Sequence, residues 1–162
     1  MSTDNQDVAA ITDHEYLTFT LGSEEYGVDI LKVQEIRGYD QVTRLPGAPD
    51  FVKGAINLRG LIVPVVDMRL KFQLSNATYD DTTVMIVLSV AGRTIGIVVD
   101  GVSDVLRLEP SQVRTVPDLG SAIDRQFLTG LGVVDERMLI LLDIERLMTS
   151  EEMGLVEQAI AA

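Results

Sequence analysis

The stretch that decides the fold is residues 26–36, YGVDILKVQEI, because its pattern of glycine, aliphatic and acidic residues occurs twice. The second occurrence is GIVVDGVSDV at residues 96–105. Flanking residues repeat at two shared offsets: Leu17, Phe19 and Leu21 match Ile86, Leu88 and Val90, and Gly54 and Asp67 match Gly130 and Asp143. Two similar small units predict a duplicated scaffold. Neither unit carries an evident catalytic constellation, which favours a binding protein.

The composition narrows the classes of partner. The chain has 162 residues, of which 46% are hydrophobic, so it can build one compact domain or two closely packed subdomains. Its net charge of −12 disfavours binding to nucleic acid and to anionic lipid, which both depend on neutralising phosphates. It contains no cysteine, which excludes disulfides, zinc–thiolate sites and cysteine nucleophiles. Protein partners are therefore expected, although the charge can also serve solubility alone.

No segment predicts insertion into a membrane. No apolar run approaches the roughly 20 residues that span a bilayer, and the acidic N-terminus lacks the basic start of a secretory signal. We therefore expect a cytoplasmic protein. Residues 1–13 are expected to form a disordered tail. Residues 14–155 form the expected folded domain, with an internal boundary near residues 73–82, and residues 150–162 are expected to be a C-terminal helix or tail.

Short alternating segments predict a mainly β structure. Apolar and polar residues alternate over residues 16–21, which is the period of a half-buried strand, and Gly60 supplies the positive φ of a tight turn. Strands are predicted at residues 16–21, 26–28, 52–58, 61–66, 84–90, 94–99, 127–134 and 138–142. Units this small bury too little surface alone. The regular spacing therefore predicts two SH3-like five-stranded β-barrels that share an apolar interface and can exchange elements.

Short capping helices are expected beside these strands. Three aspartates stand where a helix can begin: Asp29, Asp67 and Asp143. In the first of these helices, Ile30, Val33 and Ile36 are expected to share one face. Residues 102–108 fit either a strand or a short helix, because periodicity alone does not separate the two.

Residues that usually carry catalysis are missing or isolated. The single histidine, His14, is more simply a solvated residue than a base or a ligand. No nucleophile elbow, phosphate-binding loop or dinucleotide fingerprint is present, and Gly130-Leu131-Gly132 is more simply a β-bulge. The acidic pairs Asp80-Asp81 and Glu151-Glu152 lack further oxygen ligands for a metal ion. We therefore expect no enzymatic activity, no cofactor and no metal.

Two features of the sequence fit a binding role as well as a structural one. Val33 and Ile36 in the first unit match Val102 and Val105 in the second. Their spacing favours a role in the core, but they also fit an apolar groove between the barrels, which is the usual dock for a partner helix. Arg59, at a hairpin tip among aliphatic residues, is either an ordinary turn residue or a cation placed to bind a carboxylate.

Four motifs stand in order along the chain: EYGVDILKVQEIR at residues 25–37, GAINLRGLIVPVVD at residues 54–67, GIVVDGVSDV at residues 96–105 and FLTGLG at residues 127–132. Together they resemble the CheW family of chemotaxis coupling proteins over about residues 15–155. The resemblance implies two intertwined SH3-like barrels, in agreement with the repeat. It also implies an adaptor without enzymatic activity.

The resemblance further implies partners and binding residues. Proteins of this family bridge the cytoplasmic tips of methyl-accepting chemotaxis receptors and the histidine kinase CheA, docking on a CheW-like regulatory domain of that kinase within extended arrays. Receptor binding is implied for the positions that match the motifs: Val33, Glu35, Ile36, Gly54, Asn57, Arg59, Val102 and Val105. The loop residues Arg114 and Leu119 are candidates for a kinase or array contact.

Two other functions are alternatives to the adaptor. A regulatory enzyme of the same pathway, such as a phosphatase or a phosphoacceptor, is the alternative, but the CheW-like region fills the chain and leaves no room for a fused domain. A small barrel that binds nucleic acid is disfavoured by the net charge of −12 and by the lack of a surface that combines aromatic and basic residues.

Overall fold

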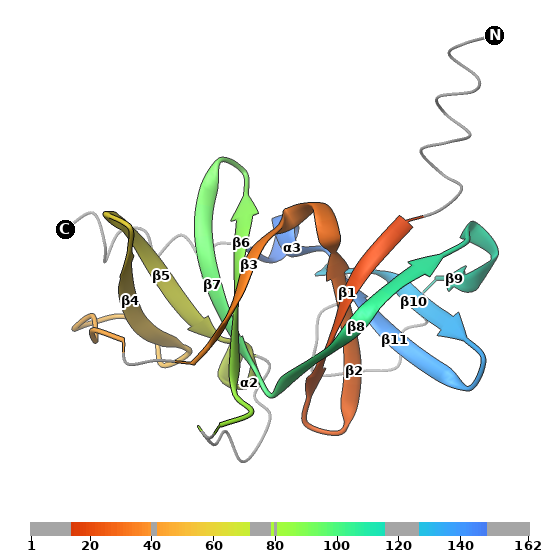
Figure 1. The fold of residues 1–162 in the computed structure, drawn as a ribbon, viewed down its shortest axis with the longest axis horizontal. Coiled ribbons are helices and arrows are strands. Elements are labelled where there is room, and N and C mark those ends of the chain that lie inside the picture. Colours follow the sequence, from red (N-terminus) through yellow and green to blue (C-terminus); the bar gives the residue numbers. More distant parts are fainter. Residues whose placement is uncertain (1–13, 40–41, 72–78, 80, 116–126, 149–162) are drawn as a thin grey trace, which may run out of the picture.

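The computed structural model describes residues 14–39, 42–71, 79, 81–115 and 127–148, which form two mainly antiparallel sheets lying next to each other (Figure 1). The six-stranded sheet has the order β8-β1-β2-β11-β10-β9. Its strands are β1 His14–Leu21, β2 Glu24–Asp29, β8 Gly101–Leu108, β9 Val113–Arg114, β10 Leu128–Val134 and β11 Arg137–Leu142.

The five-stranded sheet has the order β3-β6-β7-β5-β4. Its strands are β3 Val33–Gly38, β4 Val52–Leu58, β5 Leu61–Asp67, β6 Val84–Val90 and β7 Arg93–Val99. The helical elements are single turns: η1 Ile30–Lys32, α2 Met68–Lys71, η2 Pro110–Gln112 and α3 Ile144–Met148.

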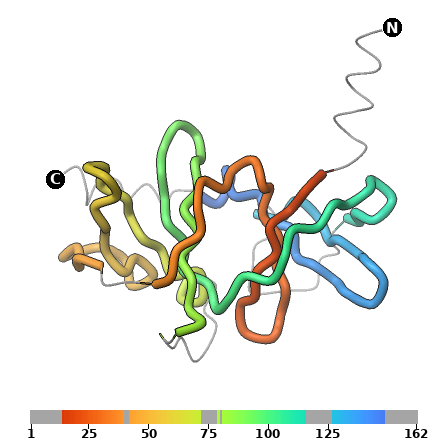
Figure 2. The backbone as a smooth tube through the Cα atoms, in the orientation of Figure 1, coloured from red at the N-terminus to blue at the C-terminus, as the bar shows by residue number. Residues whose placement is uncertain are grey.

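The two sheets match strand for strand, and they exchange hairpins. The order β8-β1-β2-β11-β10 corresponds to β3-β6-β7-β5-β4, and each sheet contains one parallel pair, β2 with β11 and β7 with β5. The β1–β2 hairpin of the first repeat therefore completes the sheet of the second, and the β6–β7 hairpin completes the sheet of the first. Figure 2 shows the chain passing between the sheets after β2 and again after β7.

The segment that follows each edge strand curls the sheet toward a barrel. Beyond β3, Thr43 forms a bridge with Ala55 of β4 through hydrogen bonds of 2.9 and 2.8 Å between their backbone N and O atoms. Beyond β8, β9 pairs with β10, with Arg114 opposite Leu131. The predicted pair of intertwined SH3-like barrels is confirmed.

The largest core cluster joins the sheets. It is made of buried apolar side chains from both, including Leu17, Phe19 and Val28 from one sheet and Ile86, Leu88 and Ile97 from the other. Full burial of each such side chain adds about 1.5–3 kcal/mol to the free energy of unfolding. Each sheet also has a smaller apolar cluster of its own, but the largest cluster is shared, so separating the sheets would expose it.

The helix predicted around residues 30–36 is wrong. Asp29 does cap a helical turn, with its Oδ1 accepting a hydrogen bond from the Leu31 N at 2.9 Å, but that turn ends at Lys32. Val33 and Ile36 lie in β3, which pairs with β6, so they do not share the face of a helix. A single helical turn satisfies few backbone groups, whereas β3 pairs with β6 from Val33 to Gly38 and so satisfies the groups that face β6.

The helices predicted to begin at Asp67 and Asp143 are present. Asp67 Oδ1 accepts from the Arg69 N at 2.9 Å at the start of α2, and Asp143 Oδ1 accepts from the Arg146 N at 3.1 Å in α3. The open choice at residues 102–108 is resolved as strand β8. The predicted tail at residues 1–13 and the predicted helix at residues 150–162 lie outside the described residues, as does most of the predicted boundary near residues 73–82.

A buried arginine ties the two sheets together near the second crossing. The Arg69 guanidinium donates to both carboxylate oxygens of Asp67, at 3.1 and 3.0 Å, and to Asp100 Oδ1 at 2.8 Å. Asp100 Oδ2 in turn accepts from the backbone N of Gly22, in the β1–β2 turn, at 2.6 Å. Burial, together with the hydrogen bond that Tyr79 donates to Asp67, raises the pKa of Tyr79.

Candidate functional site

The matched residues of the repeat lie on β3 and β8, the edge strands of the two sheets. Val33 and Val102 are partly buried and pack against the core that joins the sheets. Ile36 and Val105 are 47% and 48% exposed. The repeat therefore places one anchored and one exposed aliphatic residue on each edge strand, in the same order.

A β-bulge interrupts each edge strand between these residues. In β3 the register shifts between Val33 and Glu35. In β8 the register shifts where Leu17 faces Val105 and Phe19 faces Val102, so that two residues of β8 lie opposite Thr18. Residues three positions apart on a strand point to opposite faces, so ordinary alternation places one member of each pair against the core and the other toward solvent. The bulge adds a local bend and twist to each edge strand.

Arg59 and Glu35 meet at the rim of the five-stranded sheet. Arg59 lies at the tip of the β4–β5 hairpin with φ of 53°, and its Nη2 donates to Glu35 Oε1 at 3.2 Å. The Asn57 Oδ1 accepts from the Gly60 N at 2.7 Å and holds the turn. The carboxylate expected for Arg59 is thus supplied within the chain, and the arginine side chain remains 71% exposed.

The six-stranded sheet carries a corresponding acid that the sequence analysis did not single out. Asp104 accepts hydrogen bonds from Thr18 Oγ1 at 2.5 Å and from Arg137 Nη2 at 3.3 Å, and these donors lower the pKa of Asp104. Arg137 also donates from Nη2 to Glu25 Oε2 at 2.7 Å. The signal that could have revealed Asp104 was its match to Glu35 at the offset of the repeat.

The remaining predicted residues have different surroundings. Gly54 is buried with φ of 146°, and a Cβ atom there would lie 2.0 Å from the carbonyl oxygen of Thr43. It serves the close approach of two backbone segments. Arg114 is exposed in β9, with its Nε donating to the Ser111 O at 3.3 Å. Leu119 lies outside the described residues.

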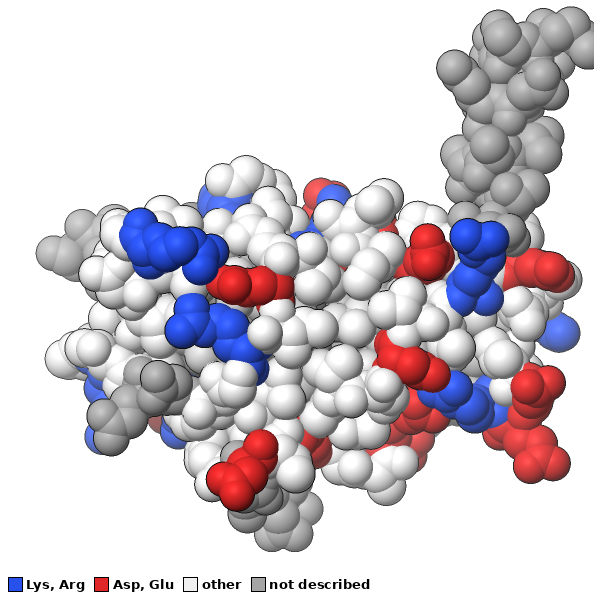
Figure 3. Space-filling view, in the orientation of Figure 1, with Lys and Arg blue, Asp and Glu red and all other residues white. Residues whose placement is uncertain are grey.

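The face between the edge strands is poor in charge. In Figure 1, β3 and β8 flank the middle of the molecule, and in the same orientation Figure 3 shows mostly uncharged side chains there. Acidic and basic side chains gather to either side. We call the exposed residues Ile36 and Val105 of the two edge strands, together with the charged pair Glu35–Arg59, the edge-strand surface.

Two further observations concern the described residues only. They contain no group of three or more histidine, aspartate or glutamate side chains that could hold a metal ion. None of the helices within them is long and apolar enough to cross a membrane.

The comparisons with known proteins agree with this geometry. The family model described as "CheW-like domain" matches residues 15–152. The chain belongs to the CheW-like family. It is 60% identical over 143 residues to chemotaxis protein CheW of Klebsiella aerogenes, covering 88% of this chain and 86% of that protein. It is 36% identical over 138 residues to chemotaxis protein CheW of Rhizobium meliloti, covering 85% and 89%.

A solved structure supports the same assignment. The scaffolding protein TtCheW from Thermoanaerobacter tengcongensis matches with a TM-score of 0.79 and 29% identity, over 86% of this chain and 94% of that one. The overall fold of this chain, with its two sheets, is therefore that of a CheW-like protein. The chain has the family and the fold of chemotaxis adaptor proteins, as the four motifs predicted.

Proposed function

We propose that this CheW-like protein is a coupling adaptor that joins methyl-accepting chemotaxis receptors to the histidine kinase CheA in arrays at the cytoplasmic face of the membrane, and that it performs no catalysis itself. The observation that carries the proposal is the edge-strand surface. It presents exposed aliphatic residues, Ile36 and Val105, beside an exposed arginine, Arg59, on a rigid double barrel. Such a surface fits the apolar face of a helix flanked by a carboxylate.

The receptor-binding set follows from this surface. Ile36, Val105 and Arg59 would touch the receptor helix directly, because their side chains are exposed and, unlike the exposed Asn57, do not hold a turn of the chain itself. Val33 and Val102 would support them from the core, Glu35 and Asn57 would orient the arginine, and Gly54 would act through the backbone. Arg114 and Leu119 are proposed as contacts with the kinase or with neighbouring subunits of an array.

The adaptor would transmit signals as a coupling free energy. If receptor and kinase bind separate faces of one rigid body, a change in receptor packing alters the preferred state of the kinase. The shared core and the buried Arg69 pairs provide that rigidity, because neither barrel can move without breaking them.

Binding experiments with purified components test the proposal. The chain should bind a receptor cytoplasmic fragment and CheA separately, in titrations monitored by calorimetry. Incubation with phosphorylated CheA should leave no label on this chain and should not accelerate loss of label from the kinase. Binding to neither partner, or phosphate transfer to the chain, would contradict the adaptor role, and phosphate transfer or hydrolysis would favour a regulatory enzyme.

A further inference from the structure

The charge of the chain is distributed unevenly along the sequence. Residues 37–71 contain six basic and three acidic residues, a net charge of +3, so the rest of the chain carries −15. A local positive region in an acidic protein attracts negatively charged partners and orients them as they approach. This region builds β4, β5, α2 and the connection between β3 and β4.

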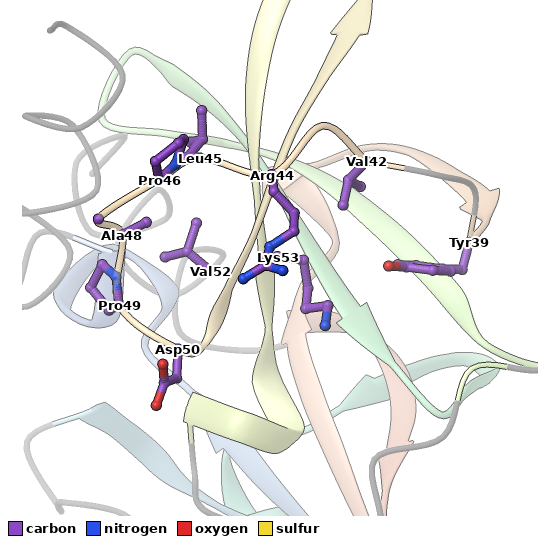
Figure 4. Close-up of a pocket in the computed structure, with 11 residues that line it drawn as sticks. Tyr39, Val42, Arg44, Leu45, Pro46, Ala48, Pro49, Asp50, Val52 and Lys53 are labelled. Atoms are coloured by element: carbon purple, nitrogen blue, oxygen red, sulfur yellow. The ribbon is translucent and has the colours of Figure 1, made fainter.

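The connection between β3 and β4 forms a pocket of about 590 Å³ (Figure 4). One wall is apolar and consists mainly of Leu45, Pro46 and Pro49. Two cations, Arg44 and Lys53, also line it, and in Figure 4 their side chains extend in the same direction from the adjoining backbone segments. The pocket therefore combines an apolar wall with two positive charges.

The backbone holds these two cations in place. Thr43 and Ala55 exchange two backbone hydrogen bonds, which fix Arg44 beside the start of β4. The register of β4 shifts between Val52 and Gly54, so Lys53 is the extra residue of a bulge and its side chain is turned accordingly. Gly54 allows this approach, because a Cβ atom there would collide with the Thr43 carbonyl oxygen.

The apolar wall is equally rigid. The Ala48 N donates to the Leu45 O at 3.2 Å, and between them Pro46 precedes Gly47 with φ of 82°, as a type II turn requires. A second turn follows, in which the Val52 N donates to the Pro49 O at 2.9 Å. A preformed pocket binds with little ordering cost, which favours recognition of a ligand over mere packing.

The two cations lack carboxylate partners among the residues that the structure describes. No described aspartate or glutamate lies within 4.0 Å of Arg44 or Lys53, and the Lys53 ammonium lies 4.7 Å from the centre of the Tyr79 ring. The second repeat has the same bulge and a glycine, Gly130, in equally close backbone contact, but Thr129 replaces the lysine. The bulge itself therefore does not require a lysine, and the charge of Lys53 remains available to the pocket that it lines with Arg44.

We propose that this pocket is a docking site for an acidic segment of a protein partner, in which carboxylates pair with Arg44 and Lys53 and an adjacent aliphatic side chain lies against Leu45 and the prolines. A polyanion such as nucleic acid fits less well, because the rest of the chain carries −15 and Asp50 stands at the end of the pocket. Neither Ile36 nor Val105 lines this pocket, and the proposal does not depend on the coupling role.

A peptide titration tests this site in the full-length chain. The probe is a fluorescein-labelled, terminally capped hexapeptide of sequence ELEELE, and its control is QLQQLQ, both followed by fluorescence anisotropy. ELEELE should bind saturably and about tenfold more tightly than QLQQLQ, because only its carboxylates can form charge-assisted hydrogen bonds with Arg44 and Lys53. Arg44→Gln combined with Lys53→Gln should weaken ELEELE about tenfold, whereas Arg93→Gln, in the β6–β7 hairpin, should change it less than twofold.

Three results would overturn the proposal. The first is equal affinity of the unaltered chain for ELEELE and QLQQLQ. Equal affinity of the double variant and the unaltered chain for ELEELE counts in the same way, provided that the two proteins have the same unfolding midpoint. The second is complete displacement of ELEELE by an equal concentration of inorganic phosphate, which would indicate a simple anion site. The third is tighter peptide binding after Glu151, Glu152 and Glu157 are changed to Gln, which would show that the chain's own C-terminal segment occupies the pocket.

Discussion

Glu35 and Asp104 occupy equivalent positions on the two edge strands, and each carboxylate accepts a hydrogen bond from an arginine of the nearby hairpin. The distances are 3.2 Å from Arg59 Nη2 to Glu35 Oε1 and 3.3 Å from Arg137 Nη2 to Asp104 Oδ1. The two pairs differ in their surroundings. Arg137 also bonds Glu25, whereas Arg59 has one acidic partner within the part of the chain that the structure describes, and its side chain is more exposed. The equivalent arginines therefore differ: Arg137 links two acidic residues, and Arg59 links one while its side chain stays 71% exposed.

Substitutions at Arg59 and Glu35 distinguish a role in receptor binding from a role in stabilising the fold. Exposed ion pairs contribute about 0–1 kcal/mol, so Arg59→Ala should leave the free energy of unfolding nearly unchanged. Receptor affinity should fall about tenfold, because a charged hydrogen bond to the receptor is lost. Calorimetric titration measures the affinity, and urea denaturation checks stability. The double variant Glu35→Arg, Arg59→Glu exchanges the two charges and should keep the fold, but its receptor affinity should stay below that of the unaltered chain. Receptor affinity equal to that of the unaltered chain would show that only the internal ion pair matters.

Substitution of Val105 tests the aliphatic part of the edge-strand surface. Val105 is 48% exposed, so Val105→Asp should cost little stability while removing an apolar contact and weakening receptor binding by about tenfold or more. Met138→Thr is the matched control, since Met138 is 58% exposed on β11 of the same sheet. Equal loss of receptor affinity in both variants would argue against a localised surface.

Thr18→Val should destabilise the fold through the bulge in β8. Thr18 is fully buried, and its hydroxyl accepts from the Asp104 N at 3.0 Å where the strand pairing is interrupted. Valine keeps the shape but leaves that N–H unsatisfied, which should cost about 1–3 kcal/mol in urea denaturation. Thr20→Val is the control, because its hydrogen bond to the Gly101 O is long, at 3.5 Å, and its loss should cost well under half as much.

The lowered pKa of Asp104 predicts a pH dependence with a definite sign. Because Thr18 and Arg137 favour the charged carboxylate in the folded state, Asp104 stabilises the fold above its unfolded pKa of about 3.9. That contribution is lost as the pH falls through the lowered folded value. The difference in unfolding free energy between the unaltered chain and Asp104→Asn should therefore shrink from pH 5 toward pH 2. A difference that stays constant over this range would contradict the assigned pairing.

Arg69→Met should be among the most destabilising single changes. It leaves the fully buried Asp67 without its cationic partner and removes the link to Asp100. Loss of one member of a buried pair costs about 3–5 kcal/mol, a large part of the roughly 5–15 kcal/mol that stabilises a domain. Arg146→Met, at an exposed pair with a distance of 3.8 Å, should cost less than about 0.5 kcal/mol by the same denaturation measurement.

Periodicity and turn chemistry predicted most strands and the barrel class, because alternating side chains and positive-φ turn residues are local properties. The hairpin tip at Arg59 and Gly60, both with positive φ, is one such case. The exchange of the β1–β2 and β6–β7 hairpins could be anticipated only as a possibility, since a repeat does not state which copy pairs with which. The helix expected at residues 30–36 failed because long-range pairing with β6 outweighed one capped turn.

The candidate site was predicted in part. The repeat located Val33, Ile36, Val102 and Val105, whose matched exposures follow from equivalent positions on equivalent strands. It did not locate Arg137, because an arginine beside a polar turn is usually solvated, and only the fold brings it to Asp104. The pocket around Lys53 also depends on tertiary structure, since a bulge and a close backbone approach cannot be read from local pattern.

Assembly of the three components together tests the central claim most directly. Sedimentation velocity of this chain mixed with a receptor cytoplasmic fragment and CheA should show a species containing all three, and kinase activity in that species should respond to the receptor. Without this chain, the receptor fragment and CheA should sediment separately and the kinase should not respond. Receptor control of CheA that persists when this chain is omitted would contradict the account.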